Sequence, residues 1–239
     1  MDEWKSGIIL KCAKSKRLEK YIYKKVNKMN MLRYFSKFLI VALAVGLLIV
    51  GLTGCGGKEE VKEESAALSK EIEDVLDKKT DLVTKEIAED PRIIKLVRES
   101  NIKNKDISLS EIKKLDERWM STEGLDEFIR GFLTNEGAEV LVEFQDANDG
   151  YPEIFVADAK GLNVAMTNKT SDYYQADEEW WVQAYDEGRG KSFHSDIEYD
   201  ESAMSEAIAL YIPIMDPDTN KAIGVMKVIV DITAIKREL

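Results

Sequence analysis

The sequence predicts an α+β domain in which a long N-terminal helix packs on an antiparallel sheet. Apolar residues recur at spacings of three and four over residues 68–97, which predicts an amphipathic helix with a charged outer face. Two later apolar runs, 207–214 and 222–232, flank a turn at 216–220 and predict an antiparallel strand pair. Helices that come first, followed by antiparallel strands, are typical of this fold class.

The first predicted helix covers residues 65–100 and is interrupted at Asp90-Pro91. Asp is a favourable N-cap and Pro fits the first helical position, so the pair predicts a kink and a restart. The near-heptad spacing leaves two arrangements open. The helix could pack on the sheet of its own domain, or it could pair with a copy of itself in a homodimer.

Two further helical segments precede the strands. Ser108 and Glu111 match a capping box and predict a short helix that runs to Trp119. The stretch 125–145 also has helical spacing, and Gly137 is expected to interrupt it.

The second half of the chain predicts strands around one short helix. Two apolar runs within 153–167 meet at the turn 158–161 and predict a β-hairpin. A short helix is expected over 176–185, and Gly188 and Gly190 should end it.

The last strand alternates between two faces. Every second residue from Gly224 to Ile232 is apolar or small, whereas Lys227 and Asp231 lie on the opposite face. The strand is therefore expected to be buried on one face. Eight residues are expected in the core: Phe155, Val164, Ile208, Leu210, Ile212, Met226, Val228 and Val230.

Charge divides the chain of 239 residues into two parts. Residues 1–37 hold eleven Lys or Arg and three Asp or Glu, a net charge of +8. Since the whole chain carries −11 and residues 38–54 are uncharged, the part from Cys55 onward carries −19. A body this acidic repels phosphate groups, which argues against binding to nucleic acid.

The front of the chain has the features of a secretion signal. Residues 38–52 are fifteen uncharged, mostly aliphatic residues, too few for a membrane span of about 20 but suitable for a signal-peptide core. Arg33 and Lys37 supply the positive charge before it. The sequence Leu-Thr-Gly-Cys that ends at Cys55 resembles the bacterial lipobox, which implies a diacylglycerol on the Cys55 thiol and cleavage before it.

These features predict four segments. Residues 31–54 are the lipoprotein signal peptide, residues 55–64 are a polar tether, and residues 65–239 are the folded domain. Residues 1–30 are expected to be an extension ahead of the true start, because signal peptides rarely carry thirty residues before the positive region. Met29 and Met31 are both suitable start residues.

The stretch 172–181 combines four large aromatic residues with four carboxylates and contains no Lys or Arg. An aromatic and acidic segment between strands suits a small polar ligand, because rings can enclose it and charges can orient it. Such clusters also occur as ordinary core or rim packing.

A resemblance favours the binding interpretation. The Tyr-Tyr-Gln and Trp-Trp elements within 172–181, with Asp200-x-Ser202 after them, resemble the extracytoplasmic Cache (PDC) sensor domains. The resemblance covers residues 65–239 and implies a PAS-like antiparallel sheet that binds a small molecule outside the bacterial membrane. It gives a list of expected ligand-binding residues: Tyr173, Tyr174, Trp180, Trp181, Tyr199, Asp200 and Ser202.

The resemblance also bears on the ligand. Cache domains that bind amino acids are similar to one another in a Tyr…Arg-x-Trp-Tyr helix and a later Asp, which hold the carboxylate and the ammonium. Tyr173, Trp180, Trp181 and Asp200 match this pattern, but Glu178 stands at the Arg position. A carboxylate there repels the ligand carboxylate, so a cationic or neutral ligand is expected.

Two other sequence patterns are weaker candidates for a metal site. Asp216, Asp218 and Asn220 imitate a calcium loop, but the residues that follow do not fit it, and a hairpin turn is expected. Asp196, Glu198 and Asp200 could share a face and hold a cation, but an exposed acidic edge explains them more simply. We therefore expect no metal site and no cofactor.

Nothing in the sequence calls for an enzyme. His194 lies between Ser192 and Ser195, but adjacency in sequence does not make a catalytic triad. We expect a lipid-anchored binding or sensing module at the extracytoplasmic side of the cell membrane. Only seven residues follow Ile232, so the signal is expected to pass to a separate membrane receptor or transporter. The alternative is an envelope structural or interaction lipoprotein that uses the fold as a dimerising scaffold. A hydrolase is the third and least favoured function.

Overall fold

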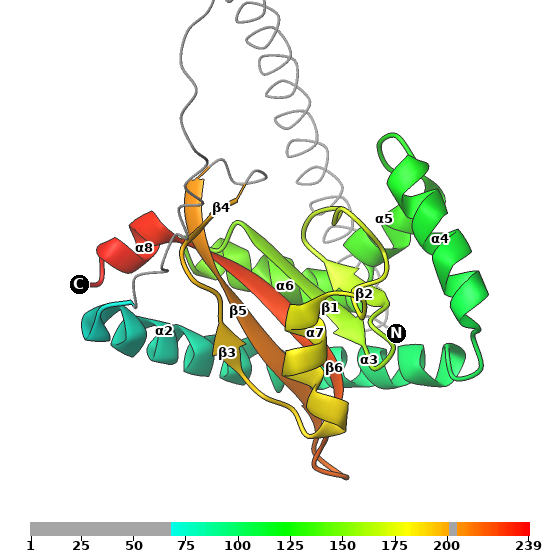
Figure 1. Cartoon of the computed structure of the whole chain (residues 1–239), viewed down its shortest axis with the longest axis horizontal. Helices are drawn as coiled ribbons and strands as arrows, with labels where there is room; N and C mark the ends of the chain where they lie inside the picture. The colour runs from blue at the N-terminus through cyan, green and yellow to red at the C-terminus, as the bar shows by residue number, and fades with distance from the viewer. Residues whose placement is uncertain (1–67, 201–204) are drawn as a thin grey trace, which may run out of the picture. The chain divides into compact units, whose positions relative to one another are not determined.

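The computed structural model describes residues 68–200 and 205–239 (Figure 1). The signal peptide, Cys55, the tether and Ser202 lie outside the described residues, and so does the side chain of Asp200. In chain order the elements are α2 (Lys70–Val83), η1 (Thr84–Ala88), α3 (Pro91–Lys103), α4 (Leu109–Ser121), α5 (Glu127–Thr134), α6 (Glu136–Ala147), β1 (Glu153–Asp158), β2 (Asn163–Met166), α7 (Glu179–Tyr185), η2 (Asp186–Gly188), β3 (Phe193–His194), β4 (Glu198–Asp200), β5 (Ser205–Asp216), β6 (Lys221–Asp231) and α8 (Ile232–Lys236).

The strands form one antiparallel sheet, so the α+β class is confirmed. Its order is β2-β1-β6-β5-β3, and β4 also pairs with β5. The long strands β5 and β6 form its centre, and the predicted turn 216–220 connects them. The hairpin predicted at 153–167 is the pair β1–β2 at one edge.

One face of the sheet is covered by α2, η1, α3 and α6, whose apolar residues form the main core with it. Met226, Val228 and Val230 of β6 point into this core and are fully buried, which confirms the predicted alternation. The helix α2 therefore packs on its own sheet, the first of the two arrangements left open. All eight predicted core residues are buried, although Phe155 belongs to the other face.

Helix α7 lies across the opposite face (Figure 1). Small residues of β5 such as Ala207 and Ala209 allow it to approach the sheet, and Trp181 and Ala184 pack against them. The sheet is thus buried on both faces where α7 covers it.

Capping side chains set the helix boundaries. Asp90 accepts a hydrogen bond from the backbone of Arg92 and Pro91 follows it, as predicted. Ser108 and Glu111 form the predicted capping box. A π-helical turn, η1, precedes the restart at Pro91 and was not predicted.

The prediction that Gly137 interrupts the helical stretch 125–145 is wrong. The break lies at Asn135, which ends α5 and also caps α6 by accepting a hydrogen bond from the backbone of Ala138. Gly137 lies inside α6, where a Cβ atom would approach Leu96 Cδ2 to 2.7 Å and Ala165 Cβ to 2.9 Å. The absence of a side chain at Gly137 permits close packing of α6 on the sheet.

Within the described residues, no helix is both long enough and apolar enough to cross a lipid bilayer.

Candidate functional site

The segment 172–181 is held in place by its backbone. Asp116 of α4 accepts hydrogen bonds from the backbone N–H groups of Tyr173 and Tyr174, at 2.7 and 3.1 Å. The Gln175 N–H donates to the carbonyl of Gly161 in the β1–β2 turn, at 2.7 Å. These contacts fix which way each aromatic side chain points before α7 begins.

Tyr173 points away from α7 into a cluster of rings. Its ring centroid lies 5.4 to 5.6 Å from those of Trp119, Phe128 and Phe132 of α4 and α5. Burial raises the pKa of Tyr173 well above its ordinary value. This residue packs α4 and α5 against the hairpin, which is a structural role.

Trp180 faces the sheet and belongs to an aromatic box, which we define as Trp180, Tyr211, Phe155, Phe193 and Lys227. The Trp180 and Tyr211 rings are stacked with centroids 5.1 Å apart, and Phe155 meets Trp180 edge-on at 6.0 Å. Phe193 contacts the other side of Tyr211 at 4.7 Å. Lys227 Nζ lies 5.2 Å from the Trp180 centroid and 5.8 Å from that of Tyr211.

The aromatic box thus already holds a cation. An ammonium within about 6 Å of two ring centroids is in cation–π contact with both. Burial, with smaller contributions from the carboxylates of Glu198 and Glu178, raises the pKa of Tyr211 to about 12, so its hydroxyl is protonated at neutral pH. The Lys227 ammonium lies beside Trp180, where the sequence predicted that a cationic ligand would bind.

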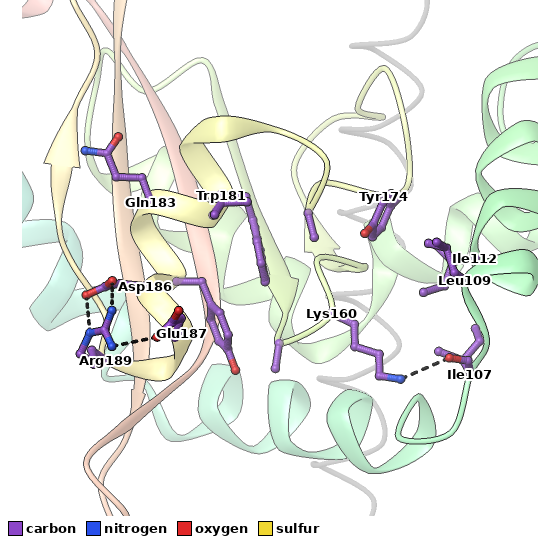
Figure 2. A pocket seen from close by; sticks show the side chains of 14 residues that line it. Ile107, Leu109, Ile112, Lys160, Tyr174, Trp181, Gln183, Asp186, Glu187 and Arg189 are labelled. Atoms are coloured by element: carbon purple, nitrogen blue, oxygen red, sulfur yellow. Dashed lines mark hydrogen bonds and ion pairs between the residues drawn. The ribbon is translucent and has the colours of Figure 1, made fainter.

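Trp181 packs on the same face of the sheet and also lines a separate cleft. A cleft of about 730 Å³, here called the α7 cleft, lies between α7 with its following loop, the β1–β2 turn and the loop before α4 (Figure 2). Trp181 lies on the α7 side, whereas Ile107, Leu109 and Ile112 lie on the opposite side. Tyr174, another predicted residue, also lines it.

Trp181 has an unsatisfied polar atom. Its side chain is only 6% exposed and stacks on Tyr185 with ring centroids 4.7 Å apart. The buried indole N–H has no hydrogen-bond partner among the described residues. An unpaired buried donor costs about 1–3 kcal/mol. Among the described residues, Tyr151 Oη and Asn163 Oδ1 are also buried without a partner, but neither residue lines the cleft.

The β1–β2 turn that forms the floor of the α7 cleft is fixed by a buried carboxylate. Asp158 accepts hydrogen bonds from Ser100 Oγ and Asn104 Nδ2, both at 2.8 Å, and from the backbone N–H groups of Lys160 and Leu162. These bonds tie the turn to the end of α3. Lys160 is therefore presented to the cleft by a rigid backbone.

The loop after α7 is strained at the cleft. Asp186 and Glu187 have φ of 46° and 54°, a region that costs non-glycine residues roughly 1–3 kcal/mol each. Arg189 binds Asp186 through two hydrogen bonds of 2.9 and 2.6 Å and Glu187 through one of 3.0 Å. Asp186 is the C-cap of α7, and helices commonly end in a residue with this left-handed conformation.

The remaining predicted residues lie elsewhere. Tyr199 is 64% exposed on β4 and pairs with Glu206, and Asp200 pairs with Ser205. Ser205 precedes Tyr211 of the aromatic box by six residues, about 20 Å along an extended strand. The structure therefore separates Asp200 from Trp180, and it groups only Tyr174 and Trp181 around one cleft.

The other polar motifs have structural partners. His194 Nε2 lies 2.8 Å from Glu73 Oε2 of α2, so this ring joins β3 to α2. Arg98 binds Asp216 at 2.9 and 2.7 Å and lowers the pKa of this carboxyl to about 2, which anchors the hairpin turn. Across residues 68–200 and 205–239, no cluster of His, Cys, Asp and Glu is placed to hold a metal ion.

The most polar parts of the α7 cleft were not predicted from the sequence. The sequence Asp158-Ala-Lys-Gly161 indicated a turn but not that Asp158 is buried or that Lys160 faces a cleft. An Asp that begins a turn commonly accepts the N–H two residues later, and this signal was available. The position of α3 beside the turn could not be predicted from local sequence.

Known proteins similar to this chain were found among solved structures. No protein-family model and no curated protein sequence matches the chain. The structure is similar to the extracellular domain of vpHK1S-Z8, described as a histidine kinase, with a TM-score of 0.42 and 13% identity over 70% of this chain. It is also similar to the ligand-binding domain of the Campylobacter jejuni chemoreceptor Tlp3 in complex with 4-methylisoleucine (0.35, 14%, 71%) and to the sensor domain of the V. cholerae histidine kinase DctB (0.36, 14%, 70%).

The chain spans 53–64% of the length of these three structures. At this level of similarity they identify no ligand, site or partner of this chain. They are described as an extracellular domain, a ligand-binding domain and a sensor domain.

Proposed function

We propose that this chain is a lipid-anchored extracytoplasmic module that binds a small molecule in the α7 cleft and passes the result to a separate membrane receptor or transporter. The observation that carries the proposal is the cleft itself. Its volume of about 730 Å³ falls in the usual range for small-molecule sites, about 300–1,000 Å³. Apolar and aromatic walls with a few polar groups are also typical of such sites.

Three features support binding at this cleft rather than elsewhere. Two residues expected from sequence, Tyr174 and Trp181, line it. The Trp181 N–H lacks an acceptor, which a ligand could supply after a small displacement of the ring. The strained residues Asp186 and Glu187 form part of its rim.

The ligand expected from sequence was cationic or neutral. Lys227 now argues against a cation at Trp180, because two ammonium groups beside the same rings repel each other. A neutral ligand, or one with an anionic group, fits the structure better.

A thermal-shift screen of the full chain in phosphatidylcholine nanodiscs against amines, amino acids and organic acids tests the proposal. Val182 lines the α7 cleft and is 55% exposed, so Val182→Glu should spoil the apolar wall without unfolding the domain. We expect it to abolish most of the ligand-induced shift. Ile197→Glu is the matched control, since Ile197 is also exposed but is not part of the cleft lining.

A ligand-induced shift that survives Val182→Glu unchanged would contradict the assignment of the cleft. The alternative function, a dimerising envelope scaffold without a ligand, is favoured by the fact that Lys227 already fills the aromatic box. It predicts that no compound shifts the melting temperature and that the chain is dimeric by light scattering.

The lipid anchor has its own test. One acyl chain binds a membrane only marginally, whereas several hold firmly, so a multiply acylated Cys55 should fractionate with membranes. We expect Cys55→Ser to release the protein or leave the precursor uncleaved. Cys12→Ser is the matched control and should change neither. Unchanged fractionation and precursor size in Cys55→Ser would refute the lipoprotein assignment.

A further inference from the structure

The charged groups that line the α7 cleft are not equivalent. Lys160, Asp186, Glu187 and Arg189 all line it. Arg189 makes three hydrogen bonds to the two carboxylates, so these three side chains satisfy one another. Lys160 stands apart, because its Nζ donates only to the neutral carbonyl of Ile107, at 3.2 Å, and forms no ion pair with a described carboxylate (Figure 2).

The ammonium of Lys160 has three donors, and one is used. The closest buried carboxylate in the same turn, Asp158, does not neutralise it. Its two oxygens accept four hydrogen bonds from other groups, including the backbone N–H of Lys160 itself. A half-buried ammonium beside apolar walls attracts an anion more strongly than one in bulk water.

The other unengaged polar groups of the cleft can all donate a hydrogen bond. Burial raises the pKa of both Tyr174 and Tyr185, and their hydroxyls, protonated at neutral pH, can donate or accept. The Trp181 N–H is a donor without an acceptor. The Gln183 amide can donate or accept. A ligand that offers oxygen acceptors can therefore bond to all of these groups and to the Lys160 ammonium, whereas an ammonium ligand is repelled by Lys160.

The walls set the rest of the ligand. Ile107, Leu109, Ile112 and Val182 contribute aliphatic surface, and Trp181 contributes a ring. A small inorganic anion would leave this surface in water. An apolar body buries it and gains roughly 25 cal/mol for each Å² removed from water.

We infer that the α7 cleft takes a small organic acid, a molecule with an apolar body and one anionic group, and that Lys160 is its counter-ion. This inference rests on the proposed function and specifies the chemistry of the same site. It differs from the expectation drawn from sequence, in which Glu178 and Asp200 select a cation.

Three compounds with one body and different charges test the inference: 2-naphthylacetate, 2-naphthylacetamide and 2-(2-naphthyl)ethylamine. Binding is measured by calorimetry on the full chain in phosphatidylcholine nanodiscs, with empty nanodiscs as the blank. We expect the acetate to bind at least tenfold more tightly than the amine, with the acetamide between them. Lys160→Met should weaken the acetate at least fivefold and change the acetamide less than twofold.

Two further variants separate charge from shape. Lys160→Arg keeps the charge and should retain the preference for the acetate. Lys221→Met removes an exposed lysine that is not part of the cleft lining and should leave all three affinities unchanged.

Equal binding of the three compounds, or tightest binding of the amine, would overturn the organic-acid inference and leave the proposed function standing. The same holds if Lys160→Met weakens all three compounds alike. If none of the three compounds binds, the thermal-shift screen decides between the two hypotheses. A ligand found there without an anionic group overturns the inference, and one with an anionic group that Lys160→Met weakens supports it. If no compound in the screen shifts the melting temperature, the proposed function is refuted together with the inference.

Discussion

Trp180 and Trp181 are neighbours in the sequence, yet they face different surroundings. Successive residues on a helix point about 100° apart. Both rings pack on the sheet face under α7, but Trp180 stacks on Tyr211 beside Lys227, whereas Trp181 stacks on Tyr185 and also lines the α7 cleft. A run of aromatic residues thus shows where rings gather but not which ring has room for a ligand.

The two sides of α7 also differ in charge. In the aromatic box, Lys227 lies against two rings, so the place of a ligand cation is already taken by this side chain. The α7 cleft has a cation, Lys160, whose hydrogen bond among the described residues goes to a backbone carbonyl. Within this part of the chain the aromatic box contains both rings and cation, whereas Lys160 has no carboxylate partner, which makes the cleft the better site for a ligand.

The largest expected effect tests the sheet on which both sides are built. Val228 is fully buried in the core, and Lys227, the residue before it, points to the α7 face. Val228→Asp should unfold residues 58–239, because an unpaired buried carboxylate costs several kcal/mol out of a total of about 5–15 kcal/mol. Lys227→Gln should cost about 1 kcal/mol or less. Urea denaturation followed by circular dichroism measures both.

Similar stability of the two variants would contradict the register of β6. It would mean that Val228 does not point into the core, and the distinction between the aromatic box and the core would fail with it.

A smaller effect is expected at the turn that carries Lys160. Gly161 has φ of 74°, and a Cβ atom there would overlap the backbone nitrogen of Ala176 and lie 2.9 Å from its Cα. Gly161→Ala should therefore destabilise the domain by about 2–4 kcal/mol, from backbone strain and overpacking together. Gly131→Ala is the matched control. Gly131 lies within α5 with nothing within 4 Å of the added atom, so it should stabilise slightly.

Gly161→Ala also separates the two sides of α7. Movement of the turn should weaken ligands in the α7 cleft and leave the near-ultraviolet circular dichroism of the Trp180–Tyr211 stack largely unchanged. If the cleft ligand binds as before, the turn does not form its floor.

Much of the fold could be predicted because its signals are local. The capping box at Ser108, the restart at Asp90 and the alternation in β6 each depend on residues close in sequence. The break at Asn135 was placed two residues too late, because Gly137 was taken as a helix breaker. Its actual role, close packing against Leu96 and Ala165, depends on elements distant in the chain.

The candidate site was less predictable for the same reason. Lys227 was correctly assigned to the face opposite the core, but only the packing of α7 over that face brings it to Trp180. Lys160 stood in a recognised turn, and its role depends on the loop before α4, more than forty residues earlier in the chain. Local patterns thus predicted the elements, whereas contacts between elements determine which residues share a site.

The smallest expected effect tests whether the aromatic box is a cation site filled by the chain itself. Lys227→Ala removes the ammonium and the three stem carbons beyond Cβ and leaves space beside the Trp180 and Tyr211 rings. The loss of stability should be modest, about 1–2 kcal/mol, because cation–π contact and stem packing each contribute on this scale. n-Propylamine has the length and charge of the missing group and should refill the space.

Adding n-propylamine should therefore raise the melting temperature of Lys227→Ala more than that of the wild type. n-Propanol, which has a similar shape without the charge, should have a smaller effect because it offers burial but no cation–π contact. Tyr211 keeps its proton at neutral pH, so the rings do not change charge during the experiment. Equal rescue by the amine and the alcohol would mean that Lys227 only fills space. The two sides of α7 would then differ in packing but not in electrostatics.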